Sequence, residues 1–190
     1  MSSLLTPKFE TALGFAFQLH KNQYRKQSQI PYISHLLAVT AIVLENGGSE
    51  NQAIAALLHD AVEDQGGYDT LQKIEEMFGS EVAEIVEGCT DAFTDPKPEW
   101  KGRKTAYLKK LKEFPDSILL VSLADKVHNA LSILRDLQSK EKDIWKRFNG
   151  GKEGTLWYYQ SLVEIFNTSP YTELTSELNR VVKEIVKLSE

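Results

Sequence analysis

The stretch Ala55–Asp64, with the sequence AALLHDAVED, places a polar tip on an otherwise apolar helix. His59 and Asp60 are adjacent, and Glu63 and Asp64 follow one turn later. Because residues three and four apart share a helix face, these side chains should form one strip before the helix ends at the glycine pair that follows. Carboxylates are unfavourable at the carbonyl end of a helix, where the macrodipole is negative. The strip is therefore either a solvated acidic tip or a site for a bound cation.

Apolar residues recur at helical spacing along the rest of the chain, and glycine and proline punctuate the pattern. Thr6 and Ser49 are predicted N-caps, and the last helix should turn Leu174, Leu178 and Leu188 inward. No segment shows the sustained alternation of a half-buried strand. We therefore predict an all-α fold in a single domain over residues 1–190, with helices over 7–23, 31–45, 49–64, 68–78, from 80 onward, 99–113, 117–137, 155–166 and 172–188, the last packing over 170–190.

The charge and cysteine content exclude several classes of function. The formal net charge is −5, which argues against a general nucleic-acid binder. Cys89 is the only cysteine, so the sequence predicts neither an intrachain disulfide nor a cysteine-based zinc site. The first residues do not have the pattern of a signal peptide, and no apolar run reaches the roughly 18–20 residues that a membrane span requires. We expect a soluble cytoplasmic protein without a membrane partner.

A second group of polar residues lies within the apolar helix predicted over residues 117–137. Asp125 shares a face with His128 and Asn129, which follow it by three and four residues. A buried carboxylate needs a partner, either an arginine or a metal ion. Together with His35 and the pair His59-Asp60, Asp125 would complete a set of two imidazoles and two carboxylates. Such a mixed set suits Mn²⁺, Fe²⁺, Zn²⁺, Co²⁺ or Ni²⁺, and such an ion activates water and polarises phosphoryl groups.

Other polar residues have a plain structural reading beside a functional one. Glu63 and Asp64 lie one turn beyond the metal candidates and could transfer protons for a nearby water. His20 sits alone on an apolar face, so a core histidine with satisfied hydrogen bonds is the favoured interpretation. The basic helix around Arg103 and Lys104 is either a solvated face or an anion site.

Five motifs carry a resemblance to a known family: YRK at 24–26, PYISH at 31–35, LLHDAVED at 57–64, FGSEVAEIVEGCTD at 78–91 and LADKVHNALSIL at 123–134. The pattern of His35, His59-Asp60 and Asp125 resembles the HD metal-dependent phosphohydrolase superfamily. The longer motifs look like the hydrolase domain of the Rel/SpoT proteins over residues 10–165. The chain leaves no room for a synthetase domain, so it looks like a stand-alone small alarmone hydrolase with an HD-domain helical bundle around a central metal.

The resemblance also implies roles for individual residues. It implies an Mn²⁺ ion, or another divalent transition metal, on the four candidate ligands, and the Glu63-Asp64 pair acting on the hydrolytic water. The family usually has threonine at Ser132, and the segment 140–154 differs from the long bifunctional enzymes. Tyr158 is a weaker candidate for the pocket wall, with core packing as the alternative. The implied substrate contacts are Arg25 and Lys26 for the base, Arg103 and Lys104 for the diphosphates, and Asn129 and Ser132 for the nucleoside.

The implied reaction is Mn²⁺-dependent hydrolysis of ppGpp or pppGpp, which releases pyrophosphate from the 3′ position and leaves GDP or GTP. Two alternatives stay open. One is cleavage of another nucleotide, such as (p)ppApp or a 5′-nucleotide, at the same site; the other is a nucleotide-sensing module with a structural metal. The sequence leaves the base preference, the physiological metal and the oligomeric state open, a homo-oligomer included.

Overall fold

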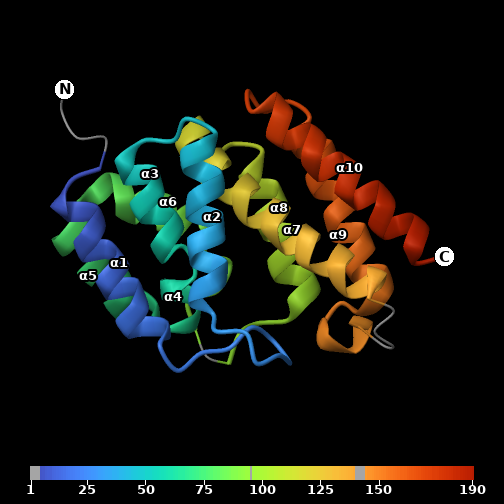
Figure 1. Cartoon of the computed structure of the whole chain (residues 1–190), viewed down its shortest axis with the longest axis horizontal. Helices are drawn as coiled ribbons and strands as arrows, with labels where there is room; N and C mark the ends of the chain where they lie inside the picture. Colours follow the sequence, from blue (N-terminus) through green and yellow to red (C-terminus); the bar gives the residue numbers. More distant parts are fainter. Residues whose placement is uncertain (1–4, 95, 140–143) are drawn as a thin grey trace.

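A computed structural model describes residues 5–94, 96–139 and 144–190. Helices account for its regular structure (Figure 1). Within the described ranges, β-type pairing is confined to an isolated bridge between Tyr24 and Pro31. The predicted all-α class is therefore confirmed. The elements are α1 (Pro7–His20), α2 (Ile33–Glu45), α3 (Glu50–Leu58), α4 (Ala61–Asp64), α5 (Gly67–Phe78), α6 (Ser80–Cys89), α7 (Trp100–Leu111), α8 (Asp116–Gln138), the 3₁₀ turn η1 (Ile144–Arg147), α9 (Gly151–Phe166) and α10 (Thr172–Leu188).

Helix α8 is the centre of the bundle. Its apolar run gives it buried residues on every side, and it packs against α2, α3, α6 and α10. Its length and composition would also suit a membrane span, but most of its apolar window is buried inside the bundle, as in the core helix of a soluble protein. Asp125 therefore reaches the interior from the most enclosed helix of the fold.

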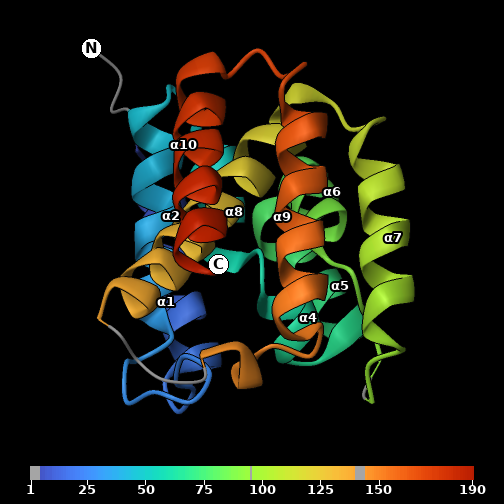
Figure 2. The ribbon, with the colours of Figure 1, turned by 90° about the vertical axis from the view of Figure 1, so that its right-hand side faces the viewer.

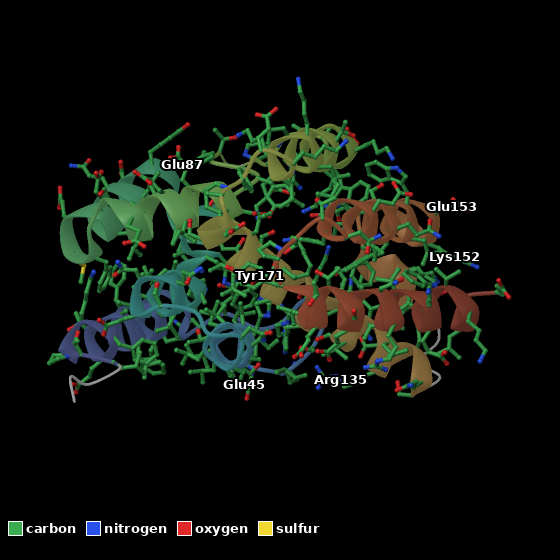
Figure 3. All side chains as sticks on the ribbon, turned by 90° about the horizontal axis from the view of Figure 1, so that it is seen from above. Glu45, Glu87, Arg135, Lys152, Glu153 and Tyr171 are labelled. Atoms are coloured by element: carbon green, nitrogen blue, oxygen red, sulfur yellow. The ribbon has the colours of Figure 1, made fainter. Side chains whose placement is uncertain are left out.

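Two groups of helices enclose the interior. Helices α1 to α6 lie on one side of α8 (Figure 1), while α9 stands between α10 and α7 on the other side and packs against both (Figure 2). Long polar side chains such as those of Glu45, Lys152 and Glu153 lie at the periphery (Figure 3). Leu174 and Leu178 are buried as predicted, whereas Leu188 in the last turn of α10 is 43% exposed, so its predicted inward position is wrong.

The predicted N-caps of α1 and α3 are confirmed. Thr6 accepts a hydrogen bond from the Lys8 amide, 3.2 Å away. Ser49 forms a reciprocal capping box with Gln52. The Gln52 amide also donates to the Ser117 carbonyl of α8 at 3.2 Å. The capping residue pair thus fixes the start of α3 against the central helix.

The helix predicted over residues 49–64 is interrupted, which corrects the sequence interpretation. Helix α3 ends at Leu58, His59 and Asp60 form a turn, and the short α4 follows. In a continuous helix, adjacent side chains point about 100° apart. The break removes that constraint and brings His59 Nε2 within 3.1 Å of Asp60 Oδ2. The interruption lets two neighbouring residues face the same point.

Candidate metal centre and nucleotide pocket

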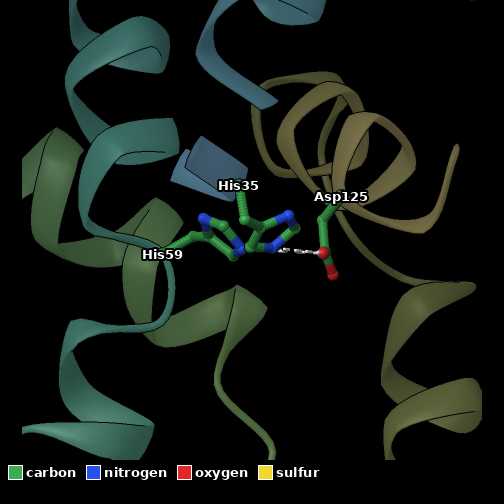
Figure 4. A group of neighbouring side chains, drawn as sticks. All are labelled: His35, His59 and Asp125. Carbon is green, nitrogen blue, oxygen red and sulfur yellow. Dashed lines mark ion pairs between the residues drawn. The ribbon is translucent and has the colours of Figure 1, made fainter. Parts of the chain in front are cut away.

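Four side chains from three segments converge on one point, and we call them the metal floor: His35, His59, Asp60 and Asp125. His35 lies in the first turn of α2, and His59 and Asp60 occupy the turn after α3. Figure 4 shows His35 and His59 beside Asp125, which projects from α8. His35 Nε2 lies 3.4 Å from Asp60 Oδ2 and 3.2 Å from Asp125 Oδ1. His59 Nε2 lies 3.1 and 3.6 Å from the same two oxygens. The structure therefore brings all four predicted ligands together.

The donor atoms of the metal floor are suited to a cation. The Nε2 atoms of His35 and His59 are buried, and among the described residues neither has a hydrogen-bond partner. His59 Nδ1 lies 2.8 Å from the Ala56 carbonyl, which can only accept, so Nδ1 carries a proton and Nε2 is the atom left to bind a metal ion. Burial would lower the pKa of His59, but Asp60 and Asp125 raise it, so a metal ion would displace a proton from Nε2. Ligand atoms of His35, His59 and Asp125 lie within 4.8 Å of one another. These two Nε2 atoms and the carboxylate oxygens that face them are suited to bind a divalent ion between them.

Outer contacts orient the two carboxylates of the metal floor. The Tyr32 hydroxyl donates to Asp60 Oδ2 at 2.5 Å. Lys126 donates to Asp125 Oδ2 at 2.5 Å, and Asn129 donates to Asp125 Oδ1 at 2.5 Å. Burial by itself would raise the pKa of Asp125, but Lys126 and the two imidazoles hold it well below its ordinary value. Asp125 therefore stays ionised, as a metal ligand must be.

His128 supports His35 from the side away from the metal floor. The two Nδ1 atoms lie 2.7 Å apart, so one imidazole donates to the other. Burial, with the nearby His35 and Arg25, lowers the pKa of His128 to about 4. A neutral His128 can accept the His35 Nδ1 proton and leave His35 Nε2 free for a metal. The sequence placed His128 on the Asp125 face without assigning this role.

A cavity of about 1060 Å³ opens above the metal floor. Asp60 and Asp125 line it, whereas the imidazoles of His35 and His59 are buried from solvent. Tyr158 also lines the cavity while being only 5% exposed, so it serves as both pocket wall and core. Ten predicted site residues line this one cavity: Arg25, Lys26, Asp60, Glu63, Asp64, Arg103, Lys104, Asp125, Asn129 and Ser132.

One side of the cavity carries three cations, Lys97, Arg103 and Lys104, which we call the cationic wall. Lys97 Nζ lies 2.8 Å from both Glu63 Oε1 and Asp64 Oδ1. Arg103 and Lys104 both pair with the buried Asp91, Lys104 at 2.7 Å. The basic helix is thus not a solvated face at these two positions. Sequence reasoning missed Lys97 and Asp91, because both lie outside the helix and their partners come from other segments.

The electrostatic setting of Glu63 differs from that of an ordinary surface glutamate. Burial, followed by the negative charges of Asp91 and Asp60, raises the pKa of Glu63, while Lys97 opposes the shift. Burial would lower the pKa of Lys97, but Glu63 and Asp64 raise it, so Lys97 is charged. A carboxylate with a raised pKa is a better proton acceptor than an unperturbed one.

The predicted base-contact residues form the opposite rim of the cavity. Arg25 Nη2 donates to Asn129 Oδ1 at 2.6 Å, and its guanidinium lies 5.6 Å from the Tyr32 ring centroid. Lys26 donates to Asn149 Oδ1 at 3.3 Å. The pairing of Arg25 with Asn129 joins two predicted substrate contacts that are far apart in sequence. Their roles toward a nucleotide stay predictions.

His20 is buried as predicted, and its surroundings connect it to the cavity. His20 Nδ1 lies 2.6 Å from Gln23 Oε1, and its ring stacks on Tyr32 with centroids 5.2 Å apart. Its Nε2 has no hydrogen-bond partner within the described part of the chain, so the histidine is only half satisfied. Gln23 lines the cavity and was not singled out from the sequence.

Comparison with known proteins identifies the family. A family model described as an HD domain matches residues 12–156. A Xenopus tropicalis protein named guanosine-3′,5′-bis(diphosphate) 3′-pyrophosphohydrolase MESH1 is 41% identical over 137 residues, 70% of this chain and 72% of that protein. The human protein of the same name is 37% identical with the same coverage of each chain.

Comparison with solved structures identifies the same family. One, described as a metazoan ortholog of SpoT that hydrolyses ppGpp, superposes with a TM-score of 0.75 at 27% identity, covering 94% of this chain and 95% of that one. A Listeria monocytogenes structure gives a TM-score of 0.67 at 29% identity, covering 80% and 99%. The chain belongs to the HD-domain family, and within it to the group that contains the MESH1 proteins.

Proposed function

We propose that this protein hydrolyses guanosine 3′,5′-bis(diphosphate), ppGpp or pppGpp, at the 3′ position to give pyrophosphate and GDP or GTP. The observation that carries the proposal is the metal floor, whose unpartnered His35 and His59 nitrogens lie under a cavity lined by Glu63 and Asp64. The cationic wall supplies the complementary charge for diphosphates. The relatives named for this activity support the same conclusion.

The reaction breaks the bond between the 3′ oxygen and its phosphorus and forms a new bond between that phosphorus and a water oxygen. A divalent ion on the metal floor supplies Lewis-acid polarisation of the phosphoryl group and makes water more acidic. Glu63, with its raised pKa, accepts a proton from the attacking water. Asp64, beside it, completes the proton-transfer pair that returns a proton to the departing 3′ oxygen.

The substrate carries several negative charges, whereas the protein has a formal net charge of −5. Local cations must therefore hold it. We expect Arg103 and Lys104 to bind the diphosphates, since guanidinium and ammonium groups bind phosphate well. We expect Arg25 and Lys26 to contact the base, and Asn129 and Ser132 the nucleoside. The partner is thus a free nucleotide, met in the cytoplasm, and not a nucleic acid.

Mn²⁺ is our proposed metal. Two imidazoles and two carboxylates form a mixed nitrogen and oxygen set that accepts a borderline ion and leaves further coordination positions open. Fe²⁺, Zn²⁺, Co²⁺ and Ni²⁺ suit the same donors. Metal analysis of the purified protein, followed by reconstitution of the apoprotein with each ion, ranks them by turnover.

A nucleotide panel tests the function. The Mn²⁺-loaded protein is incubated with ppGpp, pppGpp, ppApp and 5′-mononucleotides, and the products are separated by ion-exchange chromatography. We expect pyrophosphate together with GDP or GTP. Turnover of ppApp alone would assign the site to adenine alarmones, and orthophosphate from 5′-mononucleotides would assign it to a nucleotidase. Binding without turnover of any nucleotide would indicate a sensing module with a structural metal.

A further inference from the structure

Gln23 connects the buried His20 to the carboxylate of Asp64. Its Oε1 lies 2.6 Å from His20 Nδ1 and accepts a hydrogen bond from Gln65 Nε2 at 2.7 Å. Its Nε2 donates to Asp64 Oδ2 at 2.9 Å. Gln23 lies just beyond the end of α1, while Gln65 and Asp64 lie at the end of α4. The side-chain amide therefore bridges two segments at the edge of the cavity.

The contacts determine which way the Gln23 amide points. The Asp64 carboxylate can only accept, so it requires the NH₂ group of Gln23. Oε1 then faces two donors, and His20 Nδ1 must carry a proton because its partner is a carbonyl oxygen. The reversed amide would place its oxygen against the Asp64 carboxylate and its NH₂ against the Gln65 NH₂. All three contacts are satisfied in one orientation only.

Gln23 and Lys97 contact different oxygens of the Asp64 carboxylate. Lys97 holds Asp64 Oδ1 at 2.8 Å from the loop before α7, and Gln23 holds Asp64 Oδ2 at 2.9 Å from the other side. With one oxygen held from each direction, the plane of the carboxylate is fixed relative to the metal floor. If a phosphate bound Lys97 instead, the Gln23 contact would still hold Asp64 Oδ2.

We propose that Gln23 is a positioning residue for Asp64, and that His20 positions Gln23 by locking the orientation of its amide. The inference rests on the proposed function, in which Asp64 belongs to the proton-transfer pair. Because Gln23 acts through Asp64 and contacts no residue of the metal floor among its hydrogen bonds described above, it should affect turnover more than metal or substrate binding.

The test replaces Gln23 by glutamate and measures ppGpp hydrolysis at pH 8, well above the ordinary pKa of a glutamate carboxyl. The variant keeps an oxygen for His20 and Gln65 but loses the donor to Asp64. We expect kcat to fall at least about 10-fold, with KM and the Mn²⁺ dissociation constant each within about threefold of wild type. Lys21→Ala, an exposed residue at the same end of α1, is the matched control and should retain full kcat. An unchanged kcat for Gln23→Glu would overturn the inference.

A double-mutant cycle with Asp64→Asn shows where Gln23 acts. Alone, Asp64→Asn should lower kcat about 100-fold. Added to it, Gln23→Glu should change the residual rate less than about threefold, because its target is already gone. If Gln23→Glu lowers the rate of both backgrounds equally, it does not act through Asp64. If Asp64→Asn itself keeps wild-type kcat, the proton-transfer role in the proposed function fails; if only Gln23→Glu is silent, the positioning role fails alone.

Discussion

The metal floor and the cationic wall face the same cavity, but they differ in whether their polar groups are hydrogen-bonded to other residues. In the metal floor, two buried imidazole nitrogens have no hydrogen-bond partner among the described residues. In the cationic wall, every cation is paired with a protein carboxylate: Lys97 with Glu63 and Asp64, and Arg103 and Lys104 with Asp91. The imidazole nitrogens of the metal floor thus face only the two carboxylates that would share the metal ion, whereas the cations of the wall are in direct contact with carboxylates.

The difference indicates what each ligand must do on binding. A divalent ion can enter the metal floor without breaking a hydrogen bond to the imidazole Nε2 atoms. A diphosphate reaching the cationic wall must compete with carboxylates for Lys97, Arg103 and Lys104. Competition for Lys97 would also remove its contacts with Glu63 and Asp64, so phosphate binding would be coupled to the surroundings of the proposed proton-transfer pair.

The largest expected effect comes from removing a charge of the metal floor. Asp60→Asn keeps the size of the side chain and an oxygen for the Tyr32 hydroxyl but loses the negative charge. We expect Mn²⁺ binding to weaken by about 100-fold or more and kcat/KM to fall on the order of 1,000-fold. Calorimetric titration and turnover measure the two effects. Asp69→Asn on the exposed side of α5 is the control, and tight Mn²⁺ binding by Asp60→Asn would contradict the ligand set.

The next largest effect separates proton transfer from metal binding. Glu63→Gln removes the proposed proton acceptor and leaves all four residues of the metal floor intact. We expect kcat to fall about 100-fold to 1,000-fold while the Mn²⁺ dissociation constant stays within about threefold. Glu45→Gln at the exposed end of α2 is the matched control. Full turnover by Glu63→Gln would show that the pair next to Lys97 has no part in the chemistry.

A smaller effect should follow from weakening the cationic wall. Arg103→Met removes a cation that pairs with Asp91, and it should raise KM for ppGpp about 10-fold with a lesser change in kcat. Lys109→Met, on the exposed face of the same helix, should leave KM unchanged. Steady-state kinetics, with thermal unfolding to verify the fold, make the comparison. A KM equal to wild type would mean that Arg103 serves only Asp91.

The smallest expected effect is a shift in pH dependence. Glu63 must be ionised to accept a proton, so activity should fall as the pH drops through its pKa, which burial, Asp91 and Asp60 raise above the ordinary 4.5. Lys97 opposes that rise, so Lys97→Met should move the acidic limb of log kcat to higher pH. Profiles are measured with Mn²⁺ saturating at each pH and with exposed Lys73→Met as control. A limb that stays in place or moves to lower pH would exclude Lys97 as a partner of the catalytic base.

The sequence predicted the helical fold well because helix periodicity and caps are local properties. Thr6 and Ser49 illustrate this, since each cap is decided by a few neighbouring residues. The break between α3 and α4 was not predicted, because nothing in AALLHDAVED interrupts a helical pattern. Helix α3 packs against α2 and α8, and such tertiary contacts are not encoded in this stretch alone.

The four residues of the metal floor were predicted from residue types and from the family resemblance, and the structure brings them together. Asp91, Lys97 and Gln23 were not assigned roles. None of the three lies among the polar residues that were singled out as site candidates. Each one contacts a partner 12 to 41 residues away in the chain. Long-range pairing of this kind has no local signature in one sequence.

The most direct test of the account follows the oxygen atom of water. The Mn²⁺-loaded protein hydrolyses ppGpp in H₂¹⁸O, and mass spectrometry locates the label in the products. Attack on the phosphorus next to the 3′ oxygen predicts one ¹⁸O in pyrophosphate and none in GDP. Label in the ribose of the nucleotide, or in orthophosphate released instead of pyrophosphate, would contradict the proposed reaction.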